Sequence, residues 1–212
     1  MTTRCSLLAL TALLTSTPAL ALEGIRSESE SLEGRFELGP RLTHLRLRNA
    51  ADDTLDLGGL GLYLRYRISR RFGVEGTLDA LVADELSSTA PGDVQRVTSP
   101  LTLSALFYLF PDSRLQVYLL GGVGTAAHRV EYQALGQQVE YETVLVQVGV
   151  GAQLRLEDIR FDFSLRSLGM RTDADSVKTT GVALPAGVSY QPRTPDDQLQ
   201  GAMMTLGVNW GW

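Results

Sequence analysis

The last twelve residues of the chain, 201–212, alternate without interruption between two kinds of side chain. The even positions hold Ala, Met, Leu, Val, Trp and Trp, and the odd positions hold Gly, Met, Thr, Gly, Asn and Gly. Because successive side chains of a β-strand point to opposite faces, this period of two predicts a strand with one apolar face. A fold for this chain therefore has to place that face against an apolar medium.

Seven further segments alternate in the same way, so the sequence predicts eight strands. In one of them, Leu60, Leu62 and Leu64 face one side, and Tyr63 and Arg65 face the other. Each segment has about ten residues, which is the length that a tilted strand needs to cross a bilayer. The predicted strands cover residues 36–44, 59–68, 72–82, 96–109, 114–124, 143–155, 159–166 and 201–212.

The connections between these strands alternate in length. Tight turns are expected at 69–70, 111–113 and 156–158, and long polar loops near 48–58, 84–95, 129–142 and 172–200. Short turns at one end and long loops at the other are typical of transmembrane β-barrels, whose short turns face the periplasm. We therefore predict an all-β fold, an eight-stranded antiparallel up-and-down transmembrane β-barrel over residues 34–212.

The N-terminal residues 1–21 are typical of a secretory signal peptide. Arg4 supplies the positive charge, residues 7–14 form the apolar run, and Ala19-Leu20-Ala21 matches a cleavage site. Residues 22–33 are polar and acidic, and we expect a flexible lead-in there. The single cysteine, Cys5, lies in the predicted signal peptide, so the mature chain is expected to have no disulfide and no thiol chemistry.

The charge of the chain argues against one class of partner. The formal net charge is −5, whereas nucleic-acid binding depends on a basic patch. After the signal peptide, no segment has 18 uninterrupted apolar residues, so a membrane-spanning form of this chain requires a closed barrel.

Two observations indicate that the apolar faces of the strands point outward. The interior of an eight-stranded barrel is only just wide enough for side chains, and the Gly-, Ser- and Thr-rich faces suit that volume better than the Leu- and Val-rich faces. A face exposed to water should also be rich in Lys and Glu, but the chain has a single lysine, Lys178, in a predicted loop. The alternative is a soluble lipocalin-like barrel with an apolar interior.

Outward apolar faces place a set of charged side chains in the barrel interior. Buried ions have to be paired and hydrogen-bonded, and arginine offers a planar fork that fits carboxylates. We interpret the set as a structural plug of ion pairs, with some arginines in water at the rims; the alternative is an anion-preferring constriction. The predicted network consists of Glu37, Arg41, Arg65, Arg67, Glu75, Asp79, Arg96, Arg114, Arg155, Arg160, Asp162 and Arg166.

Aromatic side chains occur near the short-turn end of the predicted strands, where amphipathic rings favour the membrane interface. They are Phe72, Phe107, Phe161, Trp210 and Trp212. The ordinary preference of aromatic residues for strands would also place some of them there.

Three segments carry a resemblance to a known superfamily: 58–63 (Gly-Gly-Leu-Gly-Leu-Tyr), 72–76 (Phe-Gly-Val-Glu-Gly) and 118–124 (Tyr-Leu-Leu-Gly-Gly-Val-Gly). With the signal peptide, they resemble the small outer-membrane β-barrels, the group with OmpX and the transmembrane domain of OmpA. The ending 206–212 resembles the signal that the barrel-assembly machinery reads, with Trp210 and Trp212 as its aromatics, although Phe is the usual last residue. This resemblance implies an outer-membrane location and indicates little about activity.

The sequence predicts no catalytic, cofactor-binding or metal-binding residue. His44 is expected on the apolar face and His128 on the polar face, and no His-x-Ser of the lipid A deacylase type occurs. The acidic residues Asp173, Asp175, Asp196 and Asp197 are interpreted as solvated loop residues rather than a cation site.

These observations predict a monomeric outer-membrane protein with a structural or surface-interaction role. The expected partners are outer-membrane lipid and lipopolysaccharide, the barrel-assembly machinery and a surface ligand of unknown identity, with no cofactor and no nucleic acid. The alternatives are a small channel for ions or apolar solutes and, less favoured, an enzyme that modifies outer-membrane lipid.

Overall fold

The computed structural model describes residues 34–49, 54–86, 93–132, 136–156, 159–172, 176–181 and 198–211. The predicted signal peptide, the predicted lead-in, Trp212 and the acidic residues Asp173, Asp175, Asp196 and Asp197 lie outside these residues. The expectations for these parts of the chain therefore stay predictions.

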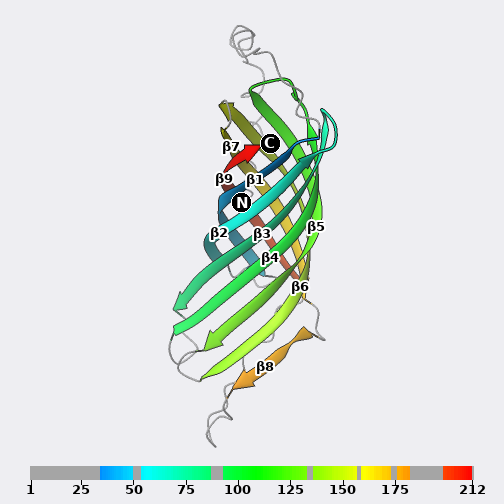
Figure 1. Cartoon of the computed structure of the whole chain (residues 1–212). Coiled ribbons are helices and arrows are strands. Elements are labelled where there is room, and N and C mark those ends of the chain that lie inside the picture. The colour runs from blue at the N-terminus through cyan, green and yellow to red at the C-terminus, as the bar shows by residue number, and fades with distance from the viewer. Residues whose placement is uncertain are drawn as a thin grey trace, which may run out of the picture.

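The described part of the chain consists almost entirely of strands, which Figure 1 shows wrapped around one axis. Eight of them are long, and β8 is a short additional strand. The strands are β1 (Phe36–Asn49), β2 (Thr54–Arg67), β3 (Phe72–Leu86), β4 (Asp93–Tyr108), β5 (Leu115–Tyr132), β6 (Gln137–Leu156), β7 (Ile159–Thr172), β8 (Lys178–Gly181) and β9 (Gln198–Gly211).

The eight long strands form a closed barrel. Their order in the sheet is β5-β4-β3-β2-β1-β9-β7-β6, and β6 pairs with β5 to close the ring. All of these neighbours are antiparallel, and β1 pairs with β9, which brings Glu37 opposite Gly211 at the short-turn end. The predicted all-β, eight-stranded up-and-down barrel is confirmed. Within the described residues, the short strand β8 pairs with the end of β6, where Lys178 lies opposite Glu140.

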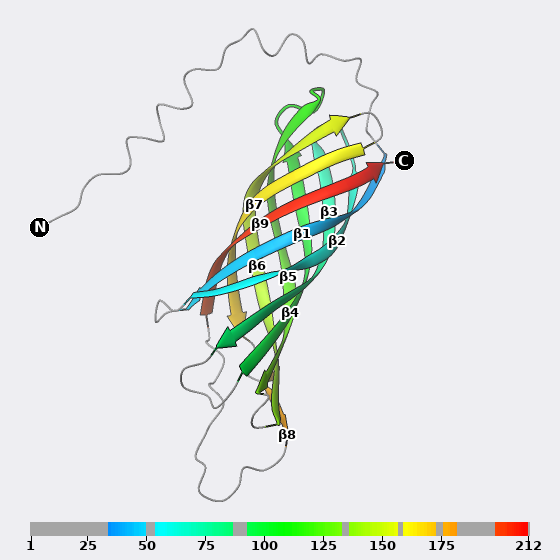
Figure 2. The ribbon, with the colours of Figure 1, turned by 90° about the vertical axis from the view of Figure 1, so that its left-hand side faces the viewer.

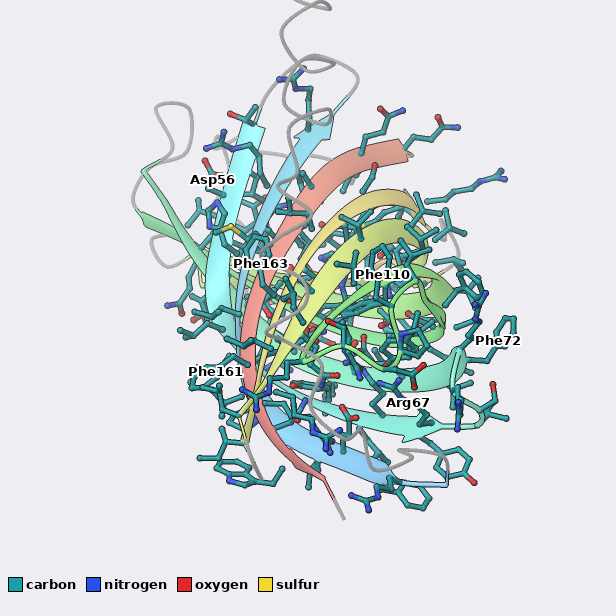
Figure 3. The ribbon with its side chains drawn as sticks, turned by 90° about the horizontal axis from the view of Figure 1, so that it is seen from above. Asp56, Arg67, Phe72, Phe110, Phe161 and Phe163 are labelled. Carbon is teal, nitrogen blue, oxygen red and sulfur yellow. The ribbon has the colours of Figure 1, made fainter. Side chains whose placement is uncertain are left out.

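An apolar belt covers the outside of the barrel. Along β2, for example, the outward Leu60, Leu62 and Leu64 are exposed, whereas the inward Tyr63 and Arg65 are buried. Exposed Leu, Val, Phe and Ile side chains continue this belt on every strand of the ring. In the belt, the apolar faces of the strands point outward, as predicted. The alternative of a soluble lipocalin-like barrel does not fit this arrangement. In Figure 3, Phe72 and Phe161 lie on opposite outer sides of the barrel with Arg67 between them.

The strands are longer than the sequence analysis predicts, because they continue into segments that were interpreted as loops. The long strands have 14 to 20 residues rather than about ten, and residues 54–58, 129–132 and 137–142 are all strand. Figure 2 shows β5, β6 and β8 extending beyond the ends of β1 and β2. The loop prediction for these segments was wrong because it took their polarity as a sign of irregular structure.

The polarity of the two faces reverses in these outer ends of the strands. On β1, Leu45 and Leu47 are buried inside the barrel, and Arg46 and Arg48 are exposed outside. On β2, Leu57 is likewise buried and Asp56 is exposed. Beyond the apolar belt the wall therefore has the pattern of a water-soluble barrel, with apolar residues inside and polar residues outside.

Candidate functional site

The barrel interior is the candidate functional site, and it contains two layers of different chemistry. A polar layer lies toward the short turns; it contains Glu37, Arg41, Arg65, Arg67, Glu75, Asp79, Arg160, Asp162 and Arg166, all buried. An apolar layer lies toward the long loops; it contains Leu45, Leu47, Leu57, Leu81, Ala83, Ala126, Leu145, Leu168, Met170, Leu199 and Met203. These charged residues come from β1, β2, β3 and β7, and the apolar residues come from β1, β2, β3, β5, β6, β7 and β9.

Arg65 lies at the centre of the polar layer and is completely buried. Its Nε and Nη2 donate to Oε2 of Glu75 at 3.2 and 2.6 Å, and its Nη1 donates to Oδ2 of Asp162 at 3.1 Å. Glu37 Oε2 lies 3.8 Å from the same Nη1, and the guanidinium carbon lies 4.8 Å from the centre of the Tyr118 ring. One cation from β2 thus connects carboxylates on β1, β3 and β7.

Other side chains extend this cluster to the opposite wall. Arg166 donates from Nη2 to Oε1 of Glu75 at 2.9 Å, and Tyr118 donates its hydroxyl to Oδ1 of Asp162 at 2.8 Å. Gln153 donates to Oε2 of Glu37 at 2.8 Å. Arg160 Nη1 lies 2.9 Å from the other oxygen of Glu37. The polar layer therefore crosses the barrel interior from wall to wall.

A second ion pair joins Arg41 of β1 to Asp79 of β3. Arg41 donates from both Nε and Nη2 to the two carboxylate oxygens, and the Thr43 hydroxyl donates to Asp79 Oδ1 at 2.8 Å. Strand β2 lies between the two strands, and its residue in register with both Arg41 and Asp79 is Gly61. A Cβ atom at Gly61 would overlap Asp79 Oδ1, so this glycine leaves the space in which the pair forms.

Arg67 lies at the short-turn end of the polar layer. Its guanidinium carbon is 3.5 Å from the centre of the Tyr108 ring, and its Nη2 donates to Oε1 of Gln116 at 2.7 Å. Gln116 in turn donates to the carbonyl of Pro111 in the β4–β5 turn at 2.7 Å. The cation–π contact and the two hydrogen bonds close this end of the interior.

Three residues of the predicted network lie apart from this layer. Arg96 is partly buried near the outer end of β4, and Arg155 is partly buried at the short-turn end of β6. Arg114 is exposed in the turn that precedes β5, so its interior position was wrong. The strand period does not apply to a turn residue, which is why the alternation misplaced it.

The predicted network contains charged residues alone, and five uncharged residues of the same inward faces also belong to the interior. Buried and hydrogen-bonded there are Tyr63, Tyr118, Gln147, Gln153 and Asn209, which the alternation of the strands already placed on the polar face. The apolar layer was missed because its residues interrupt the expected pattern of small and polar side chains on the inward face.

The two histidines face opposite sides of the wall. His128 is buried inside, with Nδ1 3.0 Å from the Thr98 hydroxyl and Nε2 2.9 Å from the Thr143 hydroxyl. His44 faces outward, with Nε2 3.5 Å from Asp56 Oδ1. Within the described ranges, no group of three His, Cys, Asp or Glu side chains is arranged to hold a metal ion, and no helix is long and apolar enough to span a membrane.

The family model described as "Outer membrane protein beta-barrel domain" matches residues 6–210. The chain belongs to this outer-membrane barrel family. The family implies a location in the outer membrane and agrees with the exposed apolar belt. Comparison with curated proteins finds no match.

Solved structures of small outer-membrane proteins share the fold. Ail, the attachment invasion locus protein of Yersinia pestis, is 13% identical with a TM-score of 0.55, over 85% of this chain and 99% of that one. Neisserial surface protein A is 13% identical with a TM-score of 0.55, over 84% and 99% of the two chains. OprG from Pseudomonas aeruginosa is 13% identical with a TM-score of 0.51, over 85% and 96%. At these identities the likeness concerns the fold alone.

Trp210 of the predicted assembly signal lies on the outer face of β9 and is about half exposed. It lies opposite Leu38 of β1 and Ile159 of β7 at the short-turn end. With Phe72 and Phe161, which are also exposed, it occupies the position of an interface aromatic.

Proposed function

We propose that the protein is a non-conducting, non-catalytic outer-membrane barrel whose interior is a structural plug and whose long-loop end makes interactions at the cell surface. The observation that supports this function is the cluster around Arg65, which is completely buried while its ion pairs join opposite walls. In a conducting pore of this size, the charged side chains would have to face a water-filled passage instead of pairing with one another across it.

The apolar layer adds a second barrier to ions. Its Leu and Met side chains have almost no exposure although they point into the barrel, and Leu45 and Leu81 have none. An ion that crossed the barrel would have to lose its water in this layer, at a large cost in free energy. The two layers together favour a plug over the anion-preferring constriction and over the small channel.

The other parts of the proposal concern export and partners. We propose that residues 1–21 are removed as a signal peptide, that Trp210 and Trp212 help the barrel-assembly machinery to recognise the chain, and that the folded barrel is a monomer. Outer-membrane lipid and lipopolysaccharide surround the belt, and a surface ligand contacts the loops. Family membership and the exposed Trp210 support these assignments.

Conductance in a planar lipid bilayer tests the proposal. The refolded barrel, identified by its faster migration on an SDS gel before boiling, should give no discrete conductance steps. A variant with Arg65→Ser, Glu75→Ser and Asp162→Ser, refolded and checked in the same way, shows that the assay detects an opened interior. Reproducible steps from the unaltered protein that change in anion preference with Arg67→Gln would overturn the plug and favour the channel.

A further inference from the structure

A hollow of about 550 Å³ lies on the wall formed by β1, β9, β7 and β6. Two registered rows of side chains cross it. The row nearer the long loops runs from Arg46 through Ala202 and Ser167 to Val148. The row nearer the short turns runs from His44 through Met204 and Leu165 to Val150. These eight side chains point outward, away from the barrel interior.

The hollow exists because small residues lie between larger ones. Ala202 and Ser167 occupy the middle of the row nearer the long loops, whereas the larger Met204 and Leu165 occupy the same positions in the other row. The apolar lining and the outward position give the hollow the chemistry of a site for a hydrocarbon chain.

The border of the hollow nearer the long loops is polar and lies where the apolar belt of β1 ends. Toward the short turns, Leu42 is exposed in the belt. At the border, Arg46 donates from Nε and Nη2 to the two oxygens of Asp56 at 2.7 and 3.2 Å, and His44 Nε2 lies 3.5 Å from the same carboxylate. The Arg46 side chain is 61% exposed, and a guanidinium has five N–H donors, so Asp56 orients this arginine without using all of its donors.

On β1 and β7, the described residues of this border include three exposed arginines. Arg48, two residues further along β1, and Arg171 at the end of β7 are both exposed. The exposed acidic side chains described toward the long loops near this wall are Asp56 on β2, beside β1, and Glu142 on β6, beside β7. At the outer end of the adjoining β5–β6 pair, Arg129 forms an ion pair with Glu140.

We propose that this hollow and its basic border bind one phosphate-bearing lipid of the outer leaflet, with an acyl chain in the hollow and a phosphate group at Arg46 and Arg48. Arginine binds phosphate through two parallel charge-assisted hydrogen bonds, which suits the exposed guanidinium groups. The hollow lies in the belt, so the molecules that reach it are those dissolved in the membrane. The inference rests on the proposed orientation, with the long loops outside, and it does not depend on whether the interior conducts.

Native mass spectrometry of the refolded barrel in a neutral detergent tests this site, with diphosphorylated lipid A as the probe. The unaltered barrel should bind one lipid A. The double variant R46Q/R48Q and the variant Ala202→Trp, which fills the hollow, should each weaken binding by about tenfold, equivalent to about 1.4 kcal/mol. The matched controls are Arg129→Gln, at the ion pair with Glu140 beyond the hollow, and Ala80→Trp on the outer face of β3, and neither should change the affinity.

Other outcomes would overturn the site. Equal binding of lipid A without phosphates would remove the role of the arginines, and equal loss in Ala202→Trp and Ala80→Trp would remove the hollow. Dimers that disappear with Ala202→Trp would assign the surface to a second copy of the chain. Binding of inorganic phosphate with the affinity of lipid A would show an anion site without a lipid. The gel shift confirms folding of each variant, and conductance of the same samples tests the plug separately.

Discussion

Replacing Arg65 by methionine should destabilise the barrel by about 3–5 kcal/mol, the usual cost of removing one partner from a buried ion pair. Arg65 is completely buried, and Glu75 and Asp162 lie 2.6 and 3.1 Å from its nitrogens. Methionine keeps much of the length of the side chain but provides no charge. The two carboxylates would then lie in the interior with the loss of their shared cation.

The measurement is urea unfolding in short-chain lipid vesicles, followed by the fraction of protein that keeps the faster gel mobility. Arg129→Met is the matched control, since Arg129 forms an exposed ion pair with Glu140 at 2.8 Å. Exposed pairs contribute about 0.2–1 kcal/mol, so the control should unfold close to the unaltered protein.

A compensated variant distinguishes unpaired charge from lost packing. Adding Glu75→Gln and Asp162→Asn to Arg65→Met removes the two negative charges and should recover more than half of the lost stability, because neutral replacements of buried ion networks are often well tolerated. A cost below about 1 kcal/mol for Arg65→Met, or no recovery in the triple variant, would refute the view of Arg65 as the central cation of the plug.

Three further changes test other parts of the structure. Gly151→Leu should cost about 1–3 kcal/mol in the same unfolding assay, because its Cβ would overlap the Tyr118 ring; an unchanged midpoint would contradict the close approach. Leu145→Ala should cost about 2–5 kcal/mol, since Leu145 is fully buried in the apolar layer, whereas the exposed Val146→Ala should cost less than half as much; equal costs would contradict the layer. Trp210→Ala should lower the yield of folded protein in the outer membrane but not its stability after refolding, as measured by gel shift of membrane fractions; an unchanged yield would exclude a role in assembly.

The part of the fold that could be predicted from the sequence is the part in contact with lipid. Leu60, Leu62 and Leu64 face outward because hydrocarbon favours apolar side chains on one face, and this alternation identifies the strand. The small volume of the interior and the single lysine then indicate which face points outward. The outer ends of the strands could not be predicted in the same way. At Leu45 and Arg46 the medium outside the barrel changes from lipid to water, and the apolar side chains point inward instead of outward. An alternation read with one medium outside the whole strand cannot predict this reversal.

The sequence predicts which charged residues lie inside the barrel but not which of them pair. The strand register shows which pairs could have been predicted. Arg65 lies directly opposite Glu75 on the neighbouring strand, so that ion pair follows from the alignment of the β2–β3 hairpin. The contact between Arg65 and Asp162 links residues 97 positions apart, from strands that are not neighbours in the ring. Only closure of the barrel brings these two side chains together, and the strand pattern carries no information about contacts across the interior.

Inward glycines make room for two contacts that skip a strand. Arg41 reaches Asp79 across Gly61, and Tyr118, which lies against Gly151 in register on β6, reaches Asp162 on the next strand, β7. In both cases a Cβ atom at the glycine would overlap the side chain that lies over it. A narrow barrel cannot hold a long polar side chain at every inward position, and glycine provides the space at these two places. Because Gly61 and Gly151 have no side chain, Arg41 and Tyr118 can each extend across the neighbouring strand to a carboxylate on the second strand along. These two glycines therefore contribute to the plug as directly as the ion pair and the hydrogen bond that lie over them.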